Sequence, residues 1–129
     1  MVTTETEFLF VYGTLMGGVD NEWSRRLWQA SGAPVEAKVA GRLYTLGGYP
    51  GMRDPEEGAA AWVHGQVARL PDSPALLADL DAYEGDEFIR LTRTATLRDG
   101  RTVPVWVYMY QPEVDENQRI WSGRFAFGQ

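Results

Sequence analysis

Two long alternating segments, 88–97 and 102–110, flank the dipeptide Asp99-Gly100 and constrain the fold more than any other part of the chain. In 102–110, valine or methionine occupies every second position from Val103 onward and alternates with aromatic residues from Trp106 onward. Side chains at a period of two lie on opposite faces of a strand. Asp-Gly between two such segments is typical of a two-residue hairpin turn, whose favoured form needs positive φ at both central residues. The sequence therefore predicts two antiparallel strands joined by a tight turn.

Three further strands are expected upstream. Residues 8–12 are apolar on both faces, which is typical of a buried central strand. A second strand is expected within 35–46, centred on 39–44, and a third within 59–70. Residues 47–51, which hold three glycines and a proline, are expected to form a loop.

Two helices complete the predicted set. One begins after Asp20 or Asn21 and ends at Gly32, and the other runs from an N-cap at Ser73 to a stop at Gly85. Ile120-Trp121 is expected to dock on the body of the protein. Residues 1–129 therefore read as a single α+β domain with mostly antiparallel strands and few helices.

Composition narrows the chemistry. The chain has 129 residues, no cysteine and one histidine, so thiolate nucleophiles, disulfides and multi-histidine metal sites are excluded. His64 is expected to be an ordinary sheet histidine. A net charge of −6 disfavours nucleic acid as a partner. No apolar run has transmembrane length, so we expect a cytoplasmic protein with no membrane partner. We also expect no metal and no cofactor.

Glu84 is the candidate catalytic residue. Leu76, Leu77, Leu80 and Tyr83 form one stripe on the second predicted helix, and Glu84 lies within it. A carboxylate aimed at apolar surroundings tends to have a raised pKa, which suits a general acid/base near neutral pH. The alternative is an ion-paired or capping glutamate at a frayed helix end. The neighbouring acidic residues, Asp81 included, are expected to be solvated.

The loop Tyr12-Gly13-Thr14-Leu15 is the candidate binding segment. It ends the buried strand, and its backbone N–H groups can converge on an anion or a polarised carbonyl. An ordinary strand-to-helix turn is the alternative. Arg90 is expected to pair with a carboxylate of the protein or of a substrate. Tyr108 and Tyr110 can place a hydroxyl in a pocket or simply pack in the core.

The chain resembles the gamma-glutamylcyclotransferase-like family over nearly its whole length. The resemblance rests on the following segments, in this order: Phe10-Val11-Tyr12-Gly13-Thr14-Leu15, Gly41-Arg42-Leu43-Tyr44, Gly48-Tyr49-Pro50-Gly51, Leu80-Asp81-Ala82-Tyr83-Glu84-Gly85, Arg90, and Val105 to Tyr110. It departs from the family at Phe88, where a tyrosine is usual, and at Arg124-Phe125, where an acidic residue and tryptophan are usual.

The resemblance implies a small, mixed β-barrel-like core flanked by short helices, with a cavity at one end. It implies a cyclotransferase that releases 5-oxoproline from a γ-glutamyl amine or γ-glutamyl amino acid by attack of the substrate's own α-amine. Glu84 would be the catalytic acid/base, and Tyr12, Gly13, Thr14, Leu15 and Tyr110 would bind the substrate. Two other readings stay open, a non-catalytic module that binds a small anionic metabolite and a carboxylate-metal hydrolase. The physiological substrate and the oligomeric state are left open.

Overall fold

The computed structural model describes residues 8–13, 15–16, 21–70 and 74–125, so the predictions made for 1–7, Thr14, Asp20 and Ser73 lie outside the described residues. These described residues form seven strands and two α-helices, with a short 3₁₀ helix near the end. In chain order they are β1 Phe8–Val11, α1 Glu22–Ser31, β2 Val35–Ala40, β3 Arg42–Thr45, β4 Pro50–Arg53, β5 Trp62–Arg69, α2 Pro74–Glu84, β6 Phe88–Leu97, β7 Thr102–Tyr110 and η1 Glu116–Gln118.

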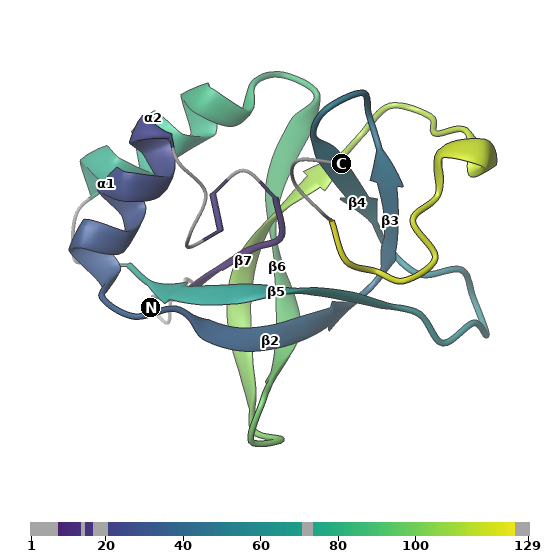
Figure 1. The fold of residues 1–129 in the computed structure, drawn as a ribbon, viewed down its shortest axis with the longest axis horizontal. Coiled ribbons are helices and arrows are strands. Elements are labelled where there is room, and N and C mark those ends of the chain that lie inside the picture. The colour runs from purple at the N-terminus through teal and green to yellow at the C-terminus, as the bar shows by residue number, and fades with distance from the viewer. Residues whose placement is uncertain (1–7, 14, 17–20, 71–73, 126–129) are drawn as a thin grey trace, which may run out of the picture.

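Five of the strands form a closed barrel. The sheet order is β1-β5-β2-β6-β7-β4-β3, and a further pairing between β1 and β7 closes the ring. All neighbours in the ring are antiparallel except β1 and β7, which run parallel. The β3–β4 pair extends the sheet from β7 on one side of the barrel, and the two helices lie on the other side (Figure 1). The predicted barrel-like α+β fold is confirmed.

Two apolar clusters hold this arrangement. One fills the barrel and includes Phe10, Val63, Val105 and Val107. The other lies between the barrel and the helices, and its fully or nearly fully buried members include Leu9, Val11, Leu27, Leu76, Leu80 and Tyr108. Successive residues of β1 therefore enter different clusters, which explains why that strand is apolar on both faces.

The predicted hairpin is present, but its turn is of a different type. β6 and β7 pair along their whole length, from Phe88 opposite Tyr110 to Thr96 opposite Thr102. The Gly100 amide donates to the Leu97 carbonyl at 2.9 Å, and Gly100 has φ of 92°. No described residue other than glycine has positive φ, so Asp99 does not take the conformation that the two-residue turn needs. The chain uses a longer loop with one left-handed position, which glycine supplies.

The middle of the chain differs from the prediction in two ways. The strand expected to centre on 39–44 is divided at Gly41 into β2 and β3. Met52 and Arg53 approach Gly41 so closely that a Cβ there would lie 2.6 Å from the Met52 side chain, which explains the break. Pro50 and Gly51, expected in a loop, begin strand β4, whose register against β3 runs from Thr45 opposite Pro50 to Arg42 opposite Arg53. Tertiary pairing outweighs the local turn preference here.

The helices agree with the prediction. Asn21 caps α1 by accepting a hydrogen bond from the Ser24 amide at 2.7 Å, and Gly32 ends the helix with φ of 84°. Gly85 follows α2 with φ of 85°. Neither described helix has the length and apolar character that crossing a membrane requires. Near the end of the chain, the Ile120 amide donates a hydrogen bond of 2.7 Å to the Leu43 carbonyl, so Ile120 docks on β3. Trp121, which was expected to dock with it, is 75% exposed.

Candidate active site

A small cavity of about 40 Å³ lies where the end of β1, the start of β4 and the end of α2 meet β7. Its lining includes Tyr12, Gly13, Leu15, Tyr49, Pro50, Glu84 and Tyr108. Gly13 is closely packed against Pro50, because a Cβ at Gly13 would lie 2.6 Å from Pro50 Cγ. Only glycine therefore lets the loop after β1 come this close to β4.

Glu84 is the carboxylic acid of this cavity, and its pKa is raised into the neutral range. Its carboxylate has no hydrogen-bond or ion-pair partner within the described part of the chain. Burial raises the pKa of Glu84 from 4.5 to about 7, and the negative charge of Asp81 adds to the rise. A carboxyl group with this pKa exchanges a proton readily at neutral pH.

Asp81 sits one helical turn before Glu84 and is held from two sides. It accepts two hydrogen bonds from Arg90, at 2.8 and 3.1 Å, and one from the Tyr108 hydroxyl at 2.7 Å. Burial would raise the pKa of Asp81, but the hydrogen bonds from Arg90 and Tyr108 outweigh it and hold this pKa below its usual value. Asp81 thus stays ionised beside Glu84. The prediction that it is merely solvated is wrong, while an ion pair for Arg90 was expected.

Arg90 and Tyr108 are fixed in turn. The Arg90 guanidinium lies over the Trp106 ring at 4.3 Å from its centre. Burial, followed by the hydrogen bond to Asp81, raises the pKa of Tyr108, so its hydroxyl remains a donor. The three residues Arg90, Asp81 and Tyr108 form a rigid support behind the glutamate.

Helix α1 holds the loop after β1 in place. The Ser24 hydroxyl donates to the Met16 carbonyl at 2.8 Å and lies 3.4 Å from the Leu15 carbonyl, and the Trp28 indole donates to the Leu15 carbonyl at 2.8 Å. The Met16 amide donates to the Gly13 carbonyl at 3.0 Å. Among the described residues, no protein acceptor meets the amides of Gly13 and Leu15. The loop is therefore held in place by α1, and its Gly13 and Leu15 N–H groups have no acceptor within the described residues.

Tyr12 has a structural partner for its hydroxyl. That hydroxyl donates to the Tyr108 carbonyl at 2.5 Å and accepts from the Met52 amide at 3.2 Å, so it ties the end of β1 to β7 and β4. Burial, with the charge of Glu84 adding to it, raises the pKa of Tyr12 far above its usual value. The phenol is therefore a neutral internal crosslink.

Residues 9–127 match the model of the family described as gamma-glutamyl cyclotransferase, AIG2-like. The chain belongs to this family. Several solved structures agree with the assignment. YtfP from Escherichia coli is 30% identical, with a TM-score of 0.62, 92% of this chain covered and 95% of that one. An AIG2-like protein from Mus musculus has a TM-score of 0.70 at 16% identity, with 93% and 88% covered.

YkqA from Bacillus subtilis has a TM-score of 0.72 at 21% identity, and the match covers 92% of this chain but 39% of YkqA. At identities of 21% and 16% the likeness to YkqA and to the mouse protein shows the fold alone. No curated protein matches significantly. Membership of the AIG2-like cyclotransferase family supports a cyclotransferase-type function.

Most of the site residues that the sequence predicts line the small cavity that contains Glu84. Tyr12, Gly13, Leu15 and Glu84 line it, and Thr14 lies outside the described residues. Tyr110 does not line it; its hydroxyl lies 3.4 Å from Glu87, and its ring packs against Phe88. The roles of these residues remain predictions.

Sequence reasoning missed Tyr49, Pro50 and the tie between Asp81 and Tyr108. Tyr49 and Pro50 belong to the segment that was expected to be only a loop. The sequence did hold a sign of the hydrogen bond between Tyr108 and Asp81. Tyr108 lies on the face of β7 opposite Val105 and Val107, and Asp81 lies three residues before Glu84 on the same helix.

Proposed function

We propose that the protein is a γ-glutamyl cyclotransferase that converts a γ-glutamyl amine or γ-glutamyl amino acid into 5-oxoproline and the free amine. The observation that carries the proposal is the partly buried Glu84 carboxyl, with a pKa of about 7 and no partner among the described residues, in one cavity with Gly13 and Leu15. Family membership supports the same reaction class.

The reaction is intramolecular. The α-amine of the substrate attacks its own γ-carbonyl carbon, a C–N bond of the five-membered ring forms, and the bond to the departing amine breaks. Holding the γ-glutamyl chain folded removes much of the entropic barrier. Glu84, as carboxylate, accepts the proton that the attacking amine loses and, as carboxylic acid, returns it to the departing amine. A pKa of about 7 allows both steps near neutral pH.

The loop after β1 supplies the complementary donors. The amides of Gly13 and Leu15 can hold the substrate α-carboxylate or the oxyanion that develops on the γ-carbonyl. Ser24 and Trp28 fix this loop from α1, so the donors need little reorganisation during the reaction. The cavity is narrow, with a volume of about 40 Å³, and Tyr49, which is 39% exposed, is the most accessible aromatic residue of its lining.

The experiment is a 5-oxoproline release assay with purified protein and a panel of γ-glutamyl amines and γ-glutamyl amino acids. Glu84→Gln keeps the shape of the side chain but cannot carry the proton, so turnover is expected to fall at least about 10²- to 10⁴-fold. A melting curve checks that the variant is folded. Saturable binding of a γ-glutamyl compound without turnover by the parent protein would instead support the binding module. Metal-dependent turnover would support the carboxylate-metal reading.

A further inference from the structure

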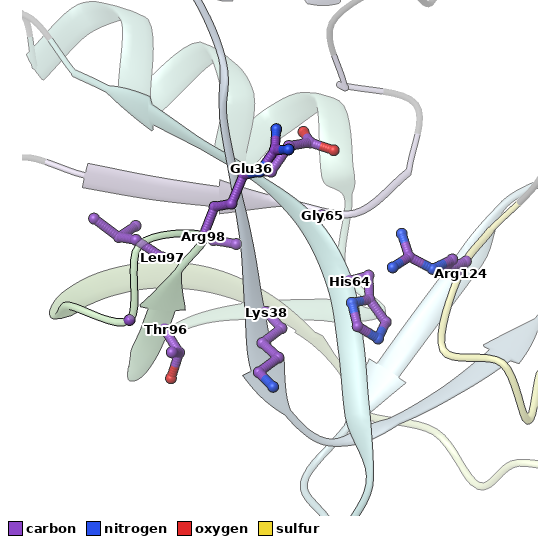
Figure 2. Close-up of a pocket in the computed structure, with 10 residues that line it drawn as sticks. Glu36, Lys38, His64, Gly65, Thr96, Leu97, Arg98 and Arg124 are labelled. Carbon is purple, nitrogen blue, oxygen red and sulfur yellow. The ribbon is translucent and has the colours of Figure 1, made fainter.

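A second, wider hollow lies on the outer face of the barrel and shares no lining residue with the Glu84 cavity. It has a volume of about 490 Å³. Its polar lining comprises Lys38, His64, Thr96, Arg98, Arg124 and Glu36 (Figure 2). The hollow is therefore large enough for a small metabolite, and most of its ionisable groups are basic.

The barrel register builds this lining. Lys38 on β2 lies opposite His64 on β5 and, on the other side, opposite Thr96 on β6. Their neighbours Val39, Val63 and Ala95 are buried in the barrel, so these three side chains share the outer face. The His64 amide donates to the Gly123 carbonyl at 2.8 Å, which holds the next residue, Arg124, beside His64. Side chains from the three strands β2, β5 and β6 and from the segment near the C-terminus thus line the same hollow.

The basic residues of this hollow differ from those elsewhere on the described surface in that they lack carboxylate partners. The chain has 12 lysine and arginine residues and a net charge of −6. Outside the hollow, the described arginines have hydrogen-bond, ion-pair or other partners, such as Asp54 for Arg93 and Asp81 for Arg90. By contrast, Lys38, Arg98 and Arg124 have no carboxylate partner among the described residues.

These three cations, which have no carboxylate partner in the described part of the chain, all line this one hollow. The Lys38 ammonium lies over the Trp62 ring, at 4.4 Å from its centre. Glu36, the acidic member of the lining, lies near Arg98 and away from His64 (Figure 2). The end formed by His64, Lys38 and Arg124 is thus positive, and no carboxylate of the described residues pairs with its cations. Burial lowers the pKa of His64, and the charges of Arg124 and Lys38 lower it further.

We propose that this hollow is a binding site for a small phosphorylated metabolite, with the phosphate group held by Lys38, Arg124 and His64. A guanidinium group can donate two parallel hydrogen bonds to phosphate oxygens, and an ammonium adds a compact charge. The Thr96 hydroxyl and the imidazole offer further donors. Arg98 lies farther along the hollow, where it can meet a second anionic group of the same ligand. This assignment does not depend on the reaction proposed for Glu84.

The single histidine of the chain is a built-in probe for the test. The C2 proton of His64 is followed by NMR while sodium pyrophosphate is added at constant ionic strength, and its pH titration is recorded with and without the anion. We expect a saturable shift and a rise in the pKa of His64, because a bound polyanion favours the imidazolium. Succinate, a dicarboxylate, is expected to bind much more weakly.

Arg124→Gln and Lys38→Gln each remove one cation from the exposed or half-buried lining, and each is expected to weaken pyrophosphate binding about tenfold or more. Arg26→Gln is the matched control, because Arg26 is a partly exposed arginine that pairs with Asp79 outside the hollow. Backbone amide spectra check the fold of each variant. The proposal is overturned if the shift does not saturate, if succinate binds as well as pyrophosphate, or if Arg124→Gln binds like Arg26→Gln.

Discussion

Replacing Glu84 with glutamine should make the folded protein more stable at alkaline pH while it removes turnover. The pKa of this carboxyl is about 7 in the folded protein against an ordinary value of 4.5. Because the folded-state pKa is the higher one, the folded protein holds the proton more tightly than the unfolded chain. The stabilisation from this proton is complete below the unfolded pKa and is lost as the pH rises through the folded pKa.

The size of the loss follows from the shift. Each pKa unit corresponds to about 1.4 kcal/mol, so ionising Glu84 in the folded state costs up to about 3 kcal/mol above pH 8. Glu84 is only partly buried, and water at the cavity mouth reduces this figure. Glutamine has no proton to lose, so it avoids the cost. The gain in free energy of unfolding should therefore be near zero at pH 4.5 and should grow to between about 1 and 3 kcal/mol at pH 9.

The assay is urea denaturation of the parent protein and of Glu84→Gln at half-unit steps from pH 4.5 to 9. Glu57→Gln serves as the control, because Glu57 is exposed and does not line the cavity. Its difference from the parent protein should not rise toward pH 9. A difference between Glu84→Gln and the parent that is the same at every pH, or a variant that is less stable at pH 9, would refute the reasoning about burial.

Three further predictions concern the support of the site and the hairpin. Asp81→Asn removes the charge that adds to the raised pKa of Glu84, so the acid limb of the pH–rate profile should move down by up to about 1 pH unit, and profiles that superimpose would contradict this. Ser24→Ala removes the hydroxyl that donates to the Met16 carbonyl, which should cost about 1–2 kcal/mol in urea denaturation and raise KM more than it lowers kcat. Gly100→Ala forces a Cβ onto a residue with φ of 92° and should cost about 1 kcal/mol by the same measurement, whereas an unchanged midpoint would show that the turn relaxes.

The strands with a clear period of two were predictable because their alternation matches the burial that the barrel imposes. β6 and β7 have the predicted bounds, and Val105 and Val107 face the barrel interior as their spacing indicates. β4 was not predictable. Its first residues, Pro50 and Gly51, have poor strand propensity, and they are extended only because β3 pairs with them.

In the candidate site, too, some features were predictable from the sequence and others were not. Glu84 could be found from its place on one helix, because helical spacing alone puts it on the apolar stripe. The ion pair that holds Asp81 could not be derived, because Arg90 approaches it only after β6 has found its register against β7. The turn at Asp99 and Gly100 was predicted as a hairpin, but the three-residue loop depends on the pairing of Leu97 with Arg101.

The parallel pairing of β1 with β7 has a consequence for how the protein is made. Residues 9–10 pair with β5 on one side, but they find their partners on the other side only at 106–107, nearly the whole chain later. A contact of such high sequence separation carries a large loop-closure cost and slows folding. During synthesis, the apolar residues of β1 leave the ribosome long before β7 exists, so they are exposed to other chains in that interval. The loop that begins at Tyr12 follows this strand directly, and the Tyr12 hydroxyl donates a hydrogen bond to the Tyr108 carbonyl on β7. The candidate site can therefore take shape only after β7 has been synthesised, and nascent chains that stop short of it should aggregate rather than bind substrate.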